Sequence, residues 1–198
     1  MNLPNKLTIL RIILTPVFLI CLLVNFPHHM LVAALIFIGA SITDAIDGNY
    51  ARKHNLVTNF GKFLDPLADK MLTTTAFLGF IALGIGRGVV IITFIVLFRE
   101  FLISSLRLTA VSSGGTVIAA NIWGKLKTIM QMVAIITAMV FEYFKYLDRS
   151  YFKFFEQFGT FTYLDIITDL LLWTSAVFAV ISGVIYLLEN KKCIDTSK

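Results

Sequence analysis

Charged residues are scarce in this chain: Asp, Glu, Lys and Arg make up only 15% of its 198 residues, while 58% are hydrophobic. A soluble domain of this length could bury a good core with much less apolar sequence. An α-helix needs about 20 apolar residues to cross a bilayer. The composition therefore predicts an integral membrane protein.

Cysteine is also nearly absent. Cys21 lies in an apolar run and Cys193 in a polar tail, so the sequence predicts neither a disulfide nor a cysteine-based metal site. The N-terminus shows no small-residue cleavage site, so we expect the first apolar run to be retained. Internal repeats are absent too. We expect one membrane-embedded domain over residues 1–190 and a polar cytoplasmic tail over residues 191–198.

Six apolar segments divide the chain. Because backbone groups in lipid must be bonded within their own segment, each segment predicts a helix. The expected fold is an all-α integral membrane protein with six transmembrane helices. Arg11 and Pro16 interrupt the first segment, so we expect the stretch before them to form a short amphipathic helix in the membrane interface. The segments are roughly Thr8–Val24, Met30–Asp47, Phe63–Leu83, Val89–Leu108, Ile129–Tyr146 and Ile166–Leu188.

The formal net charge of +5 would suggest a nucleic-acid partner in a soluble protein. In a membrane protein it is interpreted by the side on which the basic residues fall, because cytoplasmic loops carry more Lys and Arg. Most basic residues fall on the side of the N-terminus, and few on the other side. We therefore expect both termini, and the connections after the second and fourth helices, to face the cytoplasm, and we expect no nucleic acid.

Four aspartates stand inside or beside strongly apolar sequence. Asp44 and Asp47 are three residues apart, and Asp65 and Asp69 are four apart, so each pair shares one face of a helix. The connection between the pairs is about a dozen residues, which would make the two helices antiparallel neighbours. We expect the two acidic faces to converge near the cytoplasmic surface of the membrane.

Carboxylates gathered in a low-dielectric cleft repel one another unless protons or cations neutralise them. Oxygen ligands suit hard divalent ions such as Mg²⁺ or Mn²⁺. Two such ions can hold phosphate oxygens and stabilise both the attacking and the leaving group. The four aspartates therefore predict a site for two divalent cations, completed by a diphosphate substrate.

The residues between the acids fit this interpretation. Gly48, Ala51 and Gly61 are small and leave room for a ligand, while Arg52 and Lys62 supply positive charge near a phosphate. Solvated helix ends paired with nearby basic residues are the simplest alternative. A cation transporter is another, because acids within membranes often form ion paths. That alternative predicts acids spread over the membrane depth, whereas these are gathered at one hairpin.

The pattern Asp-x2-Asp-Gly-x2-Ala-Arg-x8-Gly-x3-Asp-x3-Asp, from Asp44 to Asp69, resembles the complete signature of the CDP-alcohol phosphatidyltransferase family. The resemblance implies a six-helix membrane enzyme, usually a homodimer, that displaces CMP from a CDP-linked lipid with an alcohol. Asp69 would contact the second metal ion and act as general base. The resemblance further implies metal ligation by Asp44, Asp47, Asp65 and Asp69, and a nucleotide and diphosphate site formed by Gly48, Ala51, Arg52 and Gly61, with help from Asn5 and Thr8.

Basic residues further along the chain bear on the acceptor alcohol. Arg99 and Arg107 lie eight residues apart, about 80° around a helix, so both can face one cavity. With Lys125 and Lys127 they can form a basic pocket for an anionic acceptor. Alternatively, Arg99 pairs with Glu100 or Asp69, and the lysines are orientation signals.

Several cations beside an acidic metal site favour a phosphorylated acceptor over choline or ethanolamine. The stretches DPLADK and REFLISSLR resemble bacterial family members that transfer the phosphatidyl group of CDP-diacylglycerol to sn-glycerol 3-phosphate, which gives phosphatidylglycerol phosphate and CMP. Such members act at the cytoplasmic membrane. Phosphatidylglycerol, inositol phosphate and serine remain alternative acceptors. Finally, Pro66 disfavours a helical residue before it, so we expect the third helix to begin, or bend, near Asp65.

Overall fold

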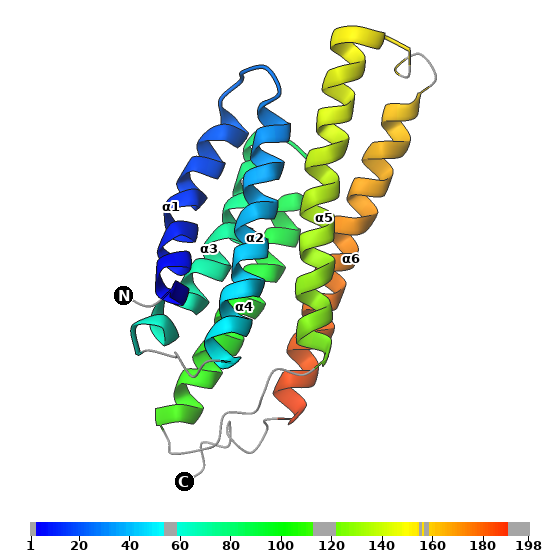
Figure 1. Cartoon of the computed structure of the whole chain (residues 1–198). Helices are drawn as coiled ribbons and strands as arrows, with labels where there is room; N and C mark the ends of the chain where they lie inside the picture. The colour runs from blue at the N-terminus through cyan, green and yellow to red at the C-terminus, as the bar shows by residue number, and fades with distance from the viewer. Residues whose placement is uncertain (1–2, 54–58, 113–121, 155, 157–158, 190–198) are drawn as a thin grey trace.

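The computed structural model folds into a bundle of long α-helices (Figure 1). It describes residues 3–53, 59–112, 122–154, 156 and 159–189, except the side chains of residues 3–4, 45–53, 59–63, 65–66, 69 and 108–112. No strand occurs within these ranges, so the all-α class is confirmed. The helices are α1 (Leu3–Leu23), α2 (His29–Lys53), α3 (Asn59–Leu83), α4 (Val89–Ser112), α5 (Ile122–Leu147), the short π-helix η1 (Asp148–Phe152) and α6 (Thr160–Glu189).

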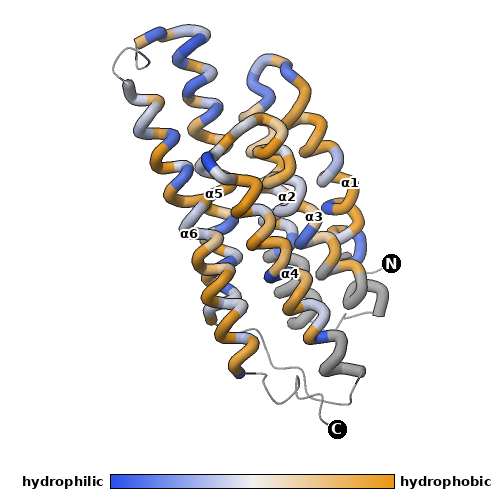
Figure 2. Tube along the Cα trace, turned by 180° about the vertical axis from the view of Figure 1, so that it is seen from behind, coloured by the Kyte–Doolittle hydropathy of each residue, from blue (hydrophilic) through white to orange (hydrophobic). Residues whose placement is uncertain are grey.

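Among the described residues, four stretches are long and apolar enough to cross a membrane: Asn5–Leu23, Val89–Arg107, Ile122–Phe152 and Thr160–Glu189. Within the described side chains, α2 and α3 contain the shorter apolar stretches His29–Asp44 and Lys70–Leu83. Figure 2 shows hydrophobic residues along most of the bundle and hydrophilic ones mainly toward its ends. Large apolar side chains are exposed on the outside of the bundle, as Phe94 on α4 illustrates with 68% exposure. The protein is therefore a multi-pass helical membrane protein.

The helix α1 is continuous from Leu3 to Leu23 and contains Pro16 in its interior. A separate interfacial helix before Arg11 is therefore not confirmed. The Arg11 side chain is 1% exposed and pairs with Asp44 of α2 inside the bundle, so its charge needs no contact with lipid headgroups. Helices in membranes also tolerate a proline, because neighbouring groups satisfy the backbone that it frees.

The helix α3 begins at Asn59, six residues before Asp65. The helix therefore does not begin near Asp65, and a bend there, which is the other form of the prediction, stays a prediction. A proline removes one backbone hydrogen bond and disfavours a helical residue before it. These are local preferences, and they do not set the start of α3 in this structure.

The helices pack in a defined order. Among the described residues, α1 packs against α2 and α3, α6 packs against α4 and α5, and contacts between α2 and α5 join these groups. Gly79 of α3 permits the close approach of α1, because a Cβ atom there would overlap the Leu22 side chain. The connection from α1 to α2 and that from α5 to α6 lie at one end of the bundle, whereas α1 begins and α6 ends at the other (Figure 1). We call the latter the motif end and the former the far end.

Candidate active site

The acidic motif lies on two antiparallel helices at the motif end. Asp44 and Asp47 belong to α2, and Asp65 and Asp69 belong to α3. The side chain of Asp44 is described, and it is 35% exposed. The other three aspartate side chains lie outside the described residues, as do those of Ala51 and Arg52 and the surroundings of Gly48 and Gly61. Among the residues that the structure does describe, no three potential metal ligands gather. The predicted metal site therefore stays a prediction.

A polar stripe on α1 faces this motif. Asn5, Thr8, Arg11 and Thr15 follow at helical spacing and are all buried, with between 1% and 7% exposure. The Arg11 guanidinium forms an ion pair with the Asp44 carboxylate. Asn5 and Thr8, which the family pattern assigns to the nucleotide site, thus lie on the α1 face that reaches the motif. We did not assign Arg11 to the site from the sequence, although a charge inside an apolar run was the signal.

A second group of charges lies nearby, which we call the Glu100 cluster: Lys70, Arg99, Glu100 and Lys127. Arg99 Nη1 lies 3.2 Å from Glu100 Oε1, and Lys70 Nζ lies 3.9 Å from Glu100 Oε2. Lys127 also pairs with Glu100 Oε1. Lys70 directly follows Asp69 in the chain, so this cluster adjoins the motif. Three helices, α3, α4 and α5, supply its side chains.

The Glu100 cluster is largely buried, because the exposed fractions of its side chains run from 5% for Lys127 to 28% for Lys70. Arg99 also donates to Ser182 Oγ on α6. Glycines border its side chain: a Cβ on Gly183 would lie 3.2 Å from Arg99 Cγ, and one on Gly124 would lie 3.8 Å from Arg99 Nη2. The bundle therefore leaves a fitted space for this arginine.

The other two predicted acceptor-site cations are placed differently. Arg107 lies over the Tyr186 ring, with its guanidinium carbon 5.6 Å from the ring centroid. Tyr186 is one turn beyond Ser182, so both arginines of α4 contact α6. Lys125 is exposed, and its place two residues from the buried Lys127 puts it on a different face of α5. The structure thus brings Arg99 and Lys127 together, while Lys125 lies apart from them.

The sequence left open that Arg99 pairs with Glu100 instead of binding the acceptor, and this pairing is present in the structure. It does not remove the cation excess, because three cations share one carboxylate within the described side chains. A buried excess of positive charge favours an anion with oxygen acceptors, such as a phosphate. Lys70 was not predicted as a site residue from the sequence, and Glu100 was predicted only as a possible partner of Arg99.

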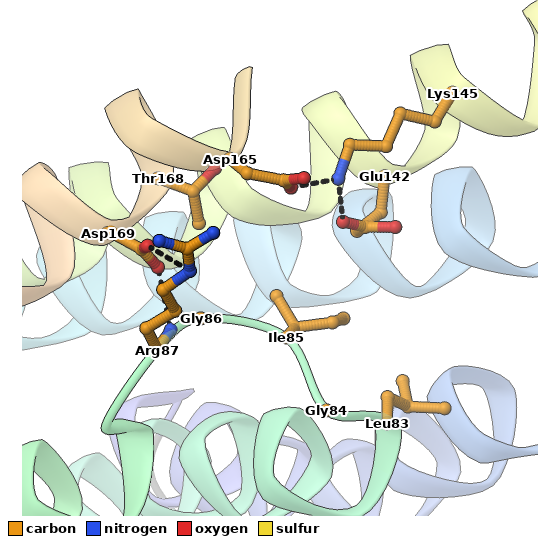
Figure 3. Close-up of a pocket in the computed structure, with 10 residues that line it drawn as sticks. All are labelled: Leu83, Gly84, Ile85, Gly86, Arg87, Glu142, Lys145, Asp165, Thr168 and Asp169. Carbon is orange, nitrogen blue, oxygen red and sulfur yellow. Dashed lines mark hydrogen bonds and ion pairs between the residues drawn. The ribbon is translucent and has the colours of Figure 1, made fainter. Parts of the chain in front are cut away.

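Another charged group lines a cavity of about 280 Å³ at the far end (Figure 3). Lys145 pairs with Asp165 and lies 2.6 Å from Glu142 Oε1. Asp169 accepts the backbone N–H of Arg87 at 2.7 Å, and Arg87 Nε lies 3.8 Å from Asp169 Oδ2. We call these five residues the far-end cluster. Each of its cations has a carboxylate partner, so the cluster joins α6 to α5 and to the connection between α3 and α4.

The motif end therefore combines two helices of equal length that bear four aspartates, a buried arginine that contacts the first of them, and a buried cation-rich cluster. This combination places charged and polar side chains within the helical bundle of a membrane protein, at the end that carries the acidic motif. The family is visible in the sequence as a whole: residues 1–181 match the profile of the CDP-alcohol phosphatidyltransferase family. The chain belongs to this family.

Individual relatives agree with this assignment. The chain is similar to a Bacillus subtilis protein named CDP-diacylglycerol–glycerol-3-phosphate 3-phosphatidyltransferase, with 38% identity that covers 99% of this chain and 98% of the relative. A Rickettsia bellii protein of the same name is 37% identical over 96% of each chain. A Mycobacterium tuberculosis protein named probable phosphatidylglycerophosphate synthase is 44% identical over 68% of this chain and 64% of its own length.

Proposed function

We propose that this chain transfers the phosphatidyl group of CDP-diacylglycerol to sn-glycerol 3-phosphate, which gives phosphatidylglycerol phosphate and CMP. The family membership and the similarity to relatives named for this reaction along almost the whole chain support the proposal. Both substrates carry phosphate, which suits a site rich in positive charge. The products would make the chain an enzyme of phospholipid synthesis.

The observation that carries the choice of acceptor is the Glu100 cluster. Lys70, Arg99 and Lys127 converge on one carboxylate immediately beside the acidic motif. A phosphate monoester carries a charge of about −1.5 to −2 at pH 7 and offers three acceptor oxygens. Serine lacks such a group, so these buried cations favour an acceptor that carries a phosphate.

Two divalent cations, Mg²⁺ or Mn²⁺, are part of the proposal. The donor chemistry fits them, because the motif offers four carboxylates and hard cations prefer oxygen ligands. The Asp44 carboxylate is partly exposed and so accessible to a ligand in addition to Arg11. Asp44, Asp47, Asp65 and Asp69 would hold the ions, which would supply positive charge to the diphosphate oxygens in the transition state.

The residues of the chain would carry the remaining steps. Asn5, Thr8, Gly48, Ala51, Arg52 and Gly61 would bind the cytidine diphosphate part. Arg99 and Lys127, with Arg107 and Lys125 as further candidates, would orient the glycerol phosphate. Asp69 would accept the proton of the attacking hydroxyl. The hydroxyl oxygen then bonds to the phosphorus that bears the diacylglycerol, the bond from that phosphorus to the CMP oxygen breaks, and CMP leaves.

We further propose that all six long helices cross the membrane, that residues 1–190 form one domain and that residues 191–198 are a polar tail. The helices α2 and α3 each have 25 residues, about 37 Å at 1.5 Å per residue, which is enough to span a bilayer. We expect the start of α1, in place of a separate helix, to reach the interface. The motif end, where both termini would lie, faces the cytoplasm in this proposal, and two copies form a homodimer in the bacterial cytoplasmic membrane.

An acceptor panel tests the proposed function. Purified protein would be given labelled CDP-diacylglycerol, Mg²⁺ or Mn²⁺, and either glycerol 3-phosphate, phosphatidylglycerol, inositol phosphate or serine. Of the four acceptors, we expect only glycerol 3-phosphate to give rapid CMP release. A chelator that removes the divalent ions should abolish that release. CMP release with another alcohol but not with glycerol 3-phosphate would show that the acceptor is wrong. Cation flux in vesicles without CMP release would favour the transporter alternative.

A further inference from the structure

We propose that Glu100 is a positioning residue for the acceptor: its carboxylate assembles Lys70, Arg99 and Lys127 into one preformed site for a phosphate monoester dianion. This inference rests on the proposed function, because it concerns the acceptor of that reaction. It gives a carboxylate a role in binding an anion, although a carboxylate on its own would repel an anion. The reasons lie in the contacts of Glu100, in the charge that it leaves and in the atoms that it does not occupy.

The contacts of Glu100 connect three helices. Oε1 accepts from Arg99 Nη1 of the same helix, at 3.2 Å, and from Lys127 of α5. Oε2 lies 3.9 Å from Lys70 Nζ of α3. Ser104, one turn further along α4, accepts from Lys70 and donates to the Glu100 carbonyl at 2.7 Å. The cations are therefore held at a common point from separate helices, and Glu100 is the group that they share.

The charge of the cluster explains why an acid is needed. Three cations close together in a poorly solvated interior repel one another, and long lysine side chains would turn away. One carboxylate reduces this repulsion and leaves a charge of two positive units among the described side chains of the cluster. A phosphate monoester brings about −1.5 to −2 at pH 7. The charge of these four side chains thus suits the dianion better than a neutral or singly charged acceptor.

Atoms left free by Glu100 point to the same role. Arg99 is held by Glu100 through Nη1 and by Ser182 through Nη2, yet its buried Nε has no hydrogen-bond partner within the described part of the chain. The Nε atom of Arg107 is likewise buried and lacks a partner there. Buried donors of this kind are costly unless a ligand satisfies them. Glu100 therefore fixes the orientation of Arg99 without using all of its donors.

The test compares Glu100→Gln with Glu100→Asp, and uses Glu142→Gln as a matched control. Glu142 is also a partly buried acid paired with a lysine, but it lies in the far-end cluster. CMP release gives kcat and the KM values for glycerol 3-phosphate and for CDP-diacylglycerol. Inorganic phosphate, added as a competitor of glycerol 3-phosphate, reports on the anion site without being turned over.

We expect Glu100→Gln to raise the KM for glycerol 3-phosphate by about tenfold or more, because it removes the common partner of three buried cations. The KM for CDP-diacylglycerol should change less than about twofold. Inhibition by inorganic phosphate should weaken in parallel with glycerol 3-phosphate binding. Glu100→Asp keeps the charge on a shorter side chain, so it should recover part of the loss. Glu142→Gln should leave both KM values near those of the wild type.

A lower KM for glycerol 3-phosphate in Glu100→Gln would overturn the proposal, because it would make Glu100 a competitor of the phosphate. Equal rises in both KM values, or the same rise in Glu142→Gln, would assign Glu100 a general structural role. If Glu100→Gln cannot be purified, Glu100→Asp decides: an unchanged acceptor KM contradicts the proposal. A wild-type protein that ignores glycerol 3-phosphate but uses another acceptor would instead refute the proposed function.

Discussion

The two ends of the bundle differ in how many carboxylates accompany their cations. In the far-end cluster two cations face three carboxylates, each cation has an acidic partner, and both Asp165 and Arg87 reach solvent, with 50% and 83% exposure. In the Glu100 cluster three cations share one carboxylate, and Arg99 and Lys127 are buried, with 14% and 5% exposure. Water reaches part of the far-end cluster, although Lys145 is only 8% exposed, whereas the four side chains of the Glu100 cluster hold a positive excess in a largely buried place.

This difference separates a group of charges that joins helices from one that fits a ligand. Exposed ion pairs contribute about 1 kcal/mol or less to stability, since solvent screens them. Buried charges without matching partners cost free energy, and a fold retains them where a bound group offsets the cost. Substitutions of the same chemical type should therefore have different effects at the two ends. At the motif end they should mainly lower activity, and at the far end they should mainly lower stability.

The largest effect is expected from the candidate base. Asp69→Asn removes the proton acceptor and one metal ligand, so CMP release should fall by about 10³-fold or more. CDP-diacylglycerol should still bind, because the other three aspartates remain. Release of labelled CMP and retention of labelled lipid measure the two properties. Asp165→Asn, a carboxylate of the far-end cluster, is the matched control and should stay within about twofold of wild type; near-normal turnover in Asp69→Asn would exclude Asp69 as the base.

The arginines of the two clusters form the next pair. Arg99→Ala removes a buried cation held by Glu100 and Ser182, so the acceptor KM should rise by about 30-fold or more, while the KM for CDP-diacylglycerol changes little. Arg87→Ala removes an exposed cation and should change neither value by more than about twofold. An unchanged acceptor KM in Arg99→Ala would return Arg99 to a structural role.

The contrast also shows what the sequence alone could predict. The helical class, the position of the acidic motif and the family follow from composition, spacing and a complete signature. The placement of Arg99 and Lys127 in one cluster could be proposed, since basic residues within apolar helices are costly. Their meeting at Glu100 could not, because it depends on how α3, α4 and α5 are rotated against one another.

The same limit explains the errors at helix ends. Arg11 and Pro16 indicate a break when the segment is considered alone, but the pairing of Arg11 with Asp44 on another helix allows α1 to continue. The start of α3 at Asn59 shows that the restriction imposed by Pro66 does not set where this helix begins. Local preferences predict the kind of element here, whereas the continuity of α1 depends on a contact with another helix that the local sequence does not show.

Lysines from the two clusters allow a reciprocal test. Lys145→Met leaves Glu142 and Asp165 without their shared cation and should cost about 1–3 kcal/mol of stability, which is partly offset because Asp165 is half exposed. Lys127→Met leaves Glu100 with Arg99 and Lys70, so it should cost less stability but should raise the acceptor KM. The midpoint of thermal denaturation in detergent and the acceptor KM measure these effects. Equal loss of activity in both variants would contradict the distinction between the ends.

The smallest expected effect concerns a single hydroxyl. Ser182→Ala removes the acceptor for Arg99 Nη2 and leaves Glu100 as the described partner that orients the guanidinium. One hydrogen bond to a charged group contributes about 1.5 kcal/mol, so the acceptor KM should rise by about tenfold. Ser175→Ala on the same helix removes a hydroxyl that bonds only to the Leu172 carbonyl among described contacts, and it should leave the KM unchanged. Equal KM values in the two variants would show that Glu100 alone is sufficient to orient Arg99.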